Sequence, residues 1–153
     1  MPEYPEKLAN VLNLFDMIED RAVRMELLIS YSERFKSVPE SVASRPFPDD
    51  HRAPNCESES YVWAELQNDS TLKFYFAVEN PQGLSAKAMA AILDECLSGA
   101  DPQEIADMPA DFAMRLFGNE LSMGKNMGLT GMIHMVQAYA RQILNARTGS
   151  IPE

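Results

Sequence analysis

The chain has 153 residues, of which 46% are hydrophobic, which predicts a single domain over residues 1–153 with an ordered core from about 6 to 146. Its 13 basic and 23 acidic residues give a formal charge of −10, which argues against binding nucleic acid or an anionic membrane, because each phosphate contact would oppose the net field. The two cysteines form no CxxC pair and no cluster with histidine, which argues against a disulfide framework and against a metal site held by this chain alone.

The first seven residues contain no basic segment followed by an apolar one, so no signal peptide is expected there. No run approaches the roughly 18 apolar residues that cross a membrane. We therefore expect a cytoplasmic protein with no membrane partner.

Residues 5–35 are expected to form two helices. Leu8, Leu12 and Phe15 recur at helical spacing, and Pro5 stands near the start of that helix, where its missing N–H costs little. Asp20 is a suitable N-cap for the second helix. The apolar stripe of the second helix consists of Val23, Leu27, Leu28, Tyr31 and Phe35.

Residues 36–54 contain four prolines and no sustained period, so they are expected to form a loop, whose length points to a function. From Tyr61 the period changes to two, with Tyr61 and Trp63 alternating with Val62 and Ala64. After a turn, residues 72–78 return as a second strand. The resulting antiparallel hairpin needs a third strand or a helical cover to be stable.

The remaining residues are expected to be helical. The pattern predicts a helix over residues 84–97 that ends at Gly99, and Asp101 and Pro102 supply the N-cap and first residue of a short helix. Residues 110–117 form another short amphipathic segment, and a last helix runs from about 125 to 147. This order predicts an α+β sandwich, in which helices pack on a small antiparallel sheet of two or three strands.

Cys56 lies where the polar, proline-rich loop turns into the aromatic strand, so its thiol can be presented to another protein. Cys96 falls on the apolar side of its helix and is expected to be part of the core. Arg52 and a protonated His51 favour the thiolate of Cys56, whereas Glu57 opposes it. The sequence shows no general base that would deprotonate the Cys56 thiol, which argues against a cysteine hydrolase. It fits a thiol that attacks a labile sulfur–sulfur bond. The position of Cys56 alone does not decide between a reactive thiol and a small apolar core residue.

The chain resembles the SufE family, sulfur-acceptor proteins that work with cysteine desulfurases in iron–sulfur cluster assembly. The signature of that family is a Gly-Cys-x-Ser-x-Val-Trp run. Cys56 and Ser58 match it, and Val62-Trp63 match after a two-residue insertion. Residues 101–105 (Asp-Pro-Gln-Glu-Ile) are similar to the family's Thr-Pro-Gln-Asp-Ile, and residues 128–133 carry its Gly-Leu-x-x-Met-Ile. The resemblance covers nearly the whole chain, in the same order.

This resemblance implies a SufE-like fold and a carrier mechanism. A PLP-dependent cysteine desulfurase would hold sulfur as a persulfide. Cys56 would accept that sulfur, activate the desulfurase and pass the sulfur to an iron–sulfur scaffold or another sulfur acceptor protein. The chain would be a non-hydrolytic sulfur-transfer protein rather than a stand-alone enzyme, with no cofactor or metal of its own, and a monomer or weak homodimer. Ser58, Trp63 and Lys125 are assigned to loop positioning or partner contact.

The sequence also departs from the family pattern. Asn55 stands in place of glycine, although Asn tolerates left-handed backbone better than most residues. Gln82 and Lys125 stand near a usual aspartate and arginine, and the two additional residues after Ser58 lengthen the loop or add a bulge. These departures motivate a second interpretation, a SufE-like adaptor that binds a partner without carrying sulfur. A third, a thiol redox protein, is opposed by the lack of a resolving cysteine near Cys56.

Overall fold

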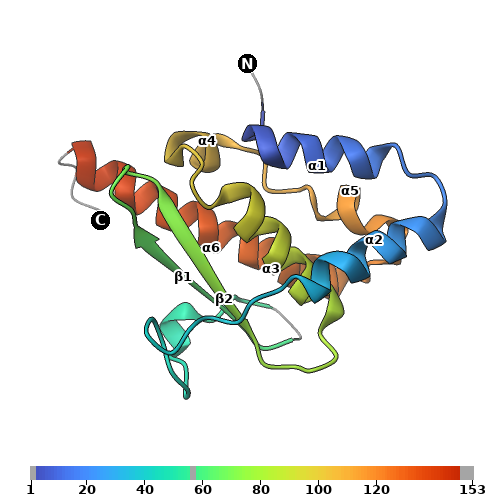
Figure 1. Ribbon diagram of the computed structural model, residues 1–153, viewed down its shortest axis with the longest axis horizontal. Coiled ribbons are helices and arrows are strands. Elements are labelled where there is room, and N and C mark those ends of the chain that lie inside the picture. Colours follow the sequence, from blue (N-terminus) through green and yellow to red (C-terminus); the bar gives the residue numbers. More distant parts are fainter. Residues whose placement is uncertain (1–2, 56–57, 149–153) are drawn as a thin grey trace.

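The computed structural model describes residues 3–55 and 58–148 and consists of helices packed on a two-stranded antiparallel sheet (Figure 1). The α-helices are α1 (Glu6–Asp16), α2 (Arg21–Glu33), α3 (Leu84–Leu97), α4 (Pro102–Asp107), α5 (Ala113–Phe117) and α6 (Met123–Thr148). The strands are β1 (Ser60–Leu66) and β2 (Leu72–Val78), and the 3₁₀ helices are η1 (Asp49–His51) and η2 (Gly118–Glu120). The α+β prediction is confirmed.

The central layer of the molecule consists of α3 and α6. Helix α3 packs against β2 and α6 packs against β1, while α1 and α4 lie on the side away from the sheet (Figure 1). This arrangement supplies the helical cover that a lone hairpin needs in order to bury its apolar face. Val62, Phe74 and Phe76 point from the sheet into this main core.

The hairpin is regular throughout its length. Its pairing runs without interruption from Ser60 opposite Val78 to Leu66 opposite Leu72. No bulge therefore lies within the paired strands, and Ser60 and Tyr61, which follow Ser58 closely, are already paired with Val78 and Ala77. The outer edge of β2 is also bonded. The Val38 N–H donates to the Phe76 carbonyl at 2.8 Å, the Gly99 N–H donates to the Leu72 carbonyl at 2.9 Å, and the Phe74 N–H donates to Ser98 Oγ at 3.0 Å.

The loop between α2 and β1 covers the second face of the hairpin. Tyr61, Trp63 and Ala77 form a separate apolar cluster there with Val38, and partly buried residues of the loop, including Phe47, pack over it. Both faces of the short sheet are therefore buried, one by helices and the other by residues of this proline-rich segment.

The N-terminal helices follow the expected pattern except at two residues, and one of these, Phe35, lies beyond the end of α2 at Glu33. Leu8, Leu12 and Phe15 are fully buried, and Asp20 accepts from the Ala22 N–H at 2.8 Å as the N-cap of α2. Val23, however, is 46% exposed. The first turns of α2 are held by polar contacts rather than by an apolar stripe.

These polar contacts come from one side chain. The Arg24 guanidinium donates to the carbonyls of Arg115 and Leu116 at 2.8 and 3.0 Å, and to those of Phe15 and Ile18 at 3.1 Å each. Because carbonyls at the C-terminal ends of helices lack intrahelical partners, one arginine here joins the ends of α1 and α5 to α2.

The C-terminal half of the chain agrees with the pattern. Helix α3 has the predicted bounds, and α4 begins as predicted with the Asp101 carboxylate accepting from the Gln103 N–H at 2.9 Å. Helix α6 begins at Met123, two residues before the expected start. Within the described ranges, no helix combines the length and apolar character that crossing a membrane requires.

Candidate functional site

A groove of about 370 Å³ opens where the starts of α3 and α6 meet the segment that enters β1. Its lining residues are Met25, Ser58, Asn80, Gln82, Gly83, Leu84, Ser85, Ala86, Lys125, Gly128 and Leu129. The groove therefore brings together Ser58, Gln82 and Lys125, which lie far apart in the sequence.

The turn before α3 forms one wall of the groove. The Asn80 side chain accepts from the Gln82 N–H at 2.9 Å, and the Gly83 N–H donates to the Asn80 carbonyl at 3.0 Å. A Cβ at Gly83 would lie 3.0 Å from Ser58 Oγ, so this glycine lets the Ser58 hydroxyl approach the turn closely. The Ser58 hydroxyl thus lies close to the start of α3.

The electrostatic character of the groove comes from a helix end and a lysine. Helix α3 begins without a side-chain cap, and Leu84, Ser85 and Ala86 of its first turn line the groove. The N-terminus of a helix carries a partial positive charge, and Lys125 lines the same groove. This combination favours a small anion, including a thiolate.

The predicted acceptor, Cys56, and its neighbour Glu57 lie outside the described residues, but the chain on each side of them is described. Asn55 has φ of 62°, the left-handed conformation that the glycine of the family signature would adopt without strain. The Ala53 N–H donates to the Ser60 carbonyl at 2.8 Å. That bond closes the base of a loop, residues 54–59, which we call the Cys56 loop.

The segment before the Cys56 loop is fastened to β1 and α6. The Tyr139 hydroxyl donates to the Val62 carbonyl at 2.8 Å, and His51 Nδ1 lies 3.0 Å from that carbonyl and 2.9 Å from the Tyr139 oxygen. The His51 ring also stacks on Trp63, with the ring centres 5.3 Å apart. The segment that leads to Cys56 is therefore bonded through His51 both to β1 and to α6.

Trp63 lies away from the groove. It is 6% exposed and packs edge-on against Phe47, with the ring centres 5.0 Å apart. Its burial favours the loop-positioning interpretation of this residue over direct partner contact, because a buried indole has little surface to offer.

Charged groups beside the Cys56 loop are partly paired with one another. Arg52 lies 3.7 Å from the Glu59 carboxylate, and both side chains are about half exposed. The Tyr61 hydroxyl donates to Glu59 at 2.9 Å, and burial together with this acidic partner raises the pKa of Tyr61. The pairing reduces the support that Arg52 alone would give to a thiolate.

Cys96 is a core residue, as expected. It is 3% exposed, and burial raises the pKa of its thiol to about 12. A thiol that stays protonated at neutral pH is a poor nucleophile. Any thiol chemistry of this chain is therefore expected at Cys56. In the described residues, no group of three histidine, cysteine or acidic side chains that could hold a metal comes together.

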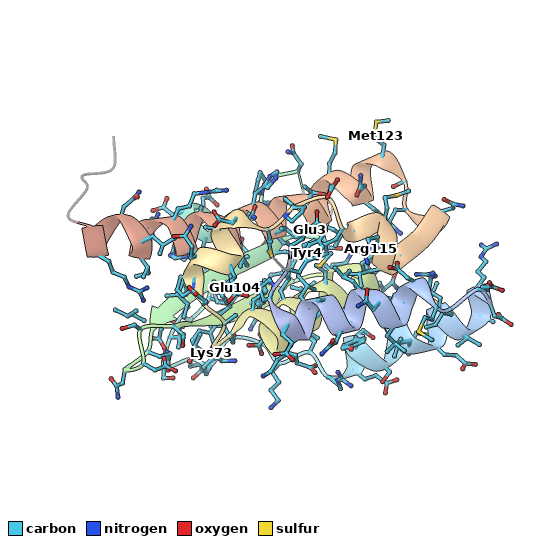
Figure 2. All side chains as sticks on the ribbon, turned by 90° about the horizontal axis from the view of Figure 1, so that it is seen from above. Glu3, Tyr4, Lys73, Glu104, Arg115 and Met123 are labelled. Atoms are coloured by element: carbon cyan, nitrogen blue, oxygen red, sulfur yellow. The ribbon has the colours of Figure 1, made fainter. Side chains whose placement is uncertain are left out.

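Some groove residues had no signal in the sequence. Asn80, Met25 and Ser85 line the groove but were not among the predicted site residues. The start of α6 also carries two exposed methionines, Met127 at 49% and Met123 at 82% exposure, and Figure 2 shows Met123 projecting outward from that helix. Only the packing of α2, α3 and α6 brings the groove side chains to one site.

Comparisons with known proteins agree on one relationship. The family described as "SufE: Fe-S metabolism associated domain" matches residues 9–140. SufE-like protein 1, chloroplastic/mitochondrial, from Arabidopsis thaliana is 27% identical over 139 residues, which cover 90% of this chain and 36% of that protein. The chain thus spans about a third of the length of that relative.

The solved structures give the same result for the fold. The solution structure of a hypothetical protein from Thermus thermophilus matches with a TM-score of 0.73 at 25% identity, covering 93% of this chain and 98% of the other. The sequence resemblance, the family match and the shared fold agree over nearly the same residues. The chain therefore belongs to the SufE family, whose domain is associated with iron–sulfur metabolism.

Proposed function

We propose that this protein is a sulfur carrier, which takes persulfide sulfur from a PLP-dependent cysteine desulfurase onto Cys56, activates that desulfurase and passes the sulfur to an iron–sulfur scaffold or another acceptor protein. Membership of the SufE family supports a role in sulfur transfer. The observation that carries the proposal is the groove in which Ser58, the start of α3 and Lys125 come together beside the Cys56 loop.

The transfer is an exchange between sulfur atoms. The Cys56 thiolate attacks the terminal sulfur of the desulfurase persulfide and forms a new sulfur–sulfur bond. The original sulfur–sulfur bond breaks, and the cysteine of the desulfurase leaves as a thiolate, so no external oxidant or reductant is needed. A thiolate of the receiving protein then attacks the terminal sulfur on Cys56 in the same way, and Cys56 is regenerated.

The groove suits a sulfur that is anionic before and after this exchange. Cys56 is two residues from Ser58 along the chain, so the span between them is at most about 7 Å. The partial positive charge at the start of α3 and the ammonium of Lys125 would lower the energy of a thiolate or persulfide there. Lysine supplies the charge without the bidentate geometry of an arginine.

The loop architecture suits presentation to a partner. The base of the Cys56 loop is closed by the Ala53–Ser60 hydrogen bond, and His51 and Tyr139 fix the segment before it. A short loop on a fixed base can offer a thiol to another protein at a defined position. The proposal includes a monomer or weak homodimer that acts in the cytoplasm, where thiols are kept reduced.

Intact-mass spectrometry tests the proposal. The protein is incubated with its cognate PLP desulfurase and cysteine, beside a Cys56→Ser control. A gain of one sulfur atom that is absent from the control is the expected result. Measurable binding of the desulfurase without any gain of sulfur would contradict the carrier proposal and select the adaptor interpretation.

A further inference from the structure

Helix α6 contains a contact that its sequence alone does not explain. A Cβ built on Gly131 would lie 2.5 Å from the Pro54 carbonyl oxygen and 3.4 Å from two carbons of the Pro54 ring. A distance of 2.5 Å is well inside van der Waals contact, and the carbonyl is backbone, which cannot rotate away as a side chain could. Pro54 can therefore hold its position only while residue 131 has no side chain.

The partner of this glycine is specific. The three atoms that a Cβ would approach most closely all belong to Pro54, and none belongs to another helix. Glycine in the middle of a helix destabilises it relative to alanine. The space at Gly131 thus serves the approach of the loop rather than the packing of α6 against its neighbouring helices.

Pro54 is the first residue of the Cys56 loop. Asn55, in the left-handed conformation, follows it directly, and Cys56 comes next in the sequence. Eight residues along α6 from Gly131, a rise of about 12 Å, the Tyr139 hydroxyl holds the Val62 carbonyl and His51. One helix therefore fixes the segment before Cys56 at two separated points.

We propose that Gly131 is a positioning residue for Cys56: by admitting the Pro54 carbonyl against α6, it sets where the Cys56 loop leaves the body of the protein and hence where the thiol is presented. This inference rests on the proposed function for its biological meaning. A side chain at residue 131 displaces Pro54 outward and moves the start of the loop with it.

The first experiment compares Gly131→Ala with the wild type by two rates. One is alkylation of Cys56 by iodoacetamide in the folded protein, followed by intact mass, in which buried Cys96 stays unreacted. The other is sulfur transfer from the desulfurase. We expect the alkylation rate to change about threefold or more and sulfur transfer to fall about tenfold, because small displacements of a reacting group are costly. The Tm should stay within about 4 °C of the wild type, because alanine favours the helix.

The matched control is His134→Ala. His134 is exposed on the same helix, and its replacement by alanine also favours the helix without touching the loop. Both rates should equal those of the wild type in this variant. A lower Tm for Gly131→Ala with both rates unchanged would show that Gly131 serves packing alone and would overturn the proposal.

Pro54→Gly keeps the carbonyl that approaches Gly131 but removes the ring that restricts the backbone beside it, and it leaves α6 intact. It should change the alkylation rate of Cys56 on its own, even if Gly131→Ala does not fold. In the double variant, the effect of Gly131→Ala should shrink, because a glycine at residue 54 lets the loop move away. An unchanged rate in Pro54→Gly, or equal effects of Gly131→Ala in both backgrounds, would overturn the proposal.

The alkylation assay separates this inference from the proposed function. If the wild-type protein accepts no sulfur, the carrier proposal fails, yet the alkylation rates still report whether Gly131 positions Cys56. If sulfur is accepted equally well by wild type and Gly131→Ala, and alkylation is also equal, the carrier proposal stands and the positioning role is rejected.

Discussion

The Cys56 loop and the last turn of α3 each carry one of the two cysteines, and the protein holds these two regions in different ways. Cys96 is enclosed by the apolar core, which leaves its side chain protonated and inaccessible. The Cys56 loop is instead held through its backbone, by the Ala53–Ser60 hydrogen bond and by the contact of Pro54 with Gly131. Fixing a loop at its base leaves the side chains between available for chemistry, whereas burial removes them from it.

Replacing each cysteine separately gives the strongest test of this comparison. Cys56→Ser should abolish sulfur acceptance, because a hydroxyl is not a comparable nucleophile. Cys96→Ala should keep the full rate of sulfur transfer and lose about 1 kcal/mol of unfolding free energy through the small cavity that it leaves. Intact-mass spectrometry and urea unfolding measure the two effects. Loss of sulfur transfer in a fully folded Cys96→Ala variant would contradict the assignment of Cys96 to the core alone.

Replacing Arg24 tests whether the stability of the helical core can change without changing the reactivity of Cys56. Arg24→Ala removes hydrogen bonds to four carbonyls at the ends of α1 and α5. We expect a loss of about 2–4 kcal/mol in the free energy of unfolding, measured in urea, because four partly buried carbonyls lose a charged donor. The alkylation rate of Cys56 in the folded variant should not change. Glu26→Ala, at an exposed residue of the same helix, provides the comparison.

Lys125 tests the charge of the groove. Lys125→Ala should slow sulfur transfer about three- to tenfold and move the alkylation profile of Cys56 to higher pH, because one positive charge near the anionic sulfur is lost. Lys125→Arg should retain most of the rate. Lys36→Ala, which removes an exposed lysine that does not line the groove, should behave like the wild type. Equal pH profiles of Cys56 alkylation in Lys125→Ala and wild type would contradict an electrostatic role for Lys125.

The last prediction concerns the pH dependence of the stability that Cys96 contributes. Its pKa in the folded protein is raised from 9.0 to about 12, so the unfolded chain releases this proton more readily than the folded one. The contribution is complete below pH 9 and is lost as the pH rises towards 12, with a slope of up to about 1.4 kcal/mol per pH unit. The difference in the free energy of unfolding between wild type and Cys96→Ala should therefore shrink above pH 9 and change sign before about pH 10.5. A constant difference would contradict the burial-raised pKa.

Local signals in the sequence predicted most of the elements. The alternation of residues 72–78, the cap at Asp20 and the Asp101-Pro102 start of α4 all act within a few residues of themselves. The left-handed conformation of Asn55 is also a local signal, because asparagine tolerates a positive φ better than most residues do.

Features that depend on distant partners were not predicted. Val23 is exposed, whereas its neighbour Arg24 contacts α1 and α5, and the bond from Tyr139 to the Val62 carbonyl joins residues 77 positions apart. The groove, likewise, exists only once α2, α3 and α6 have packed. The sequence named Ser58 and Lys125 as candidates, but only the fold puts them on one surface.

The bonded edge of β2 has a consequence for behaviour at high concentration. Sheets with open edges recruit strands from other molecules, and short sheets are exposed to this on two sides. Here the Leu72 carbonyl, the Phe74 N–H and the Phe76 carbonyl are already bonded to the Gly99 N–H, Ser98 Oγ and the Val38 N–H. A strand from a second molecule would have to displace these bonds before it could form its own. A hairpin of only two strands is in this way guarded against edge-to-edge aggregation along β2.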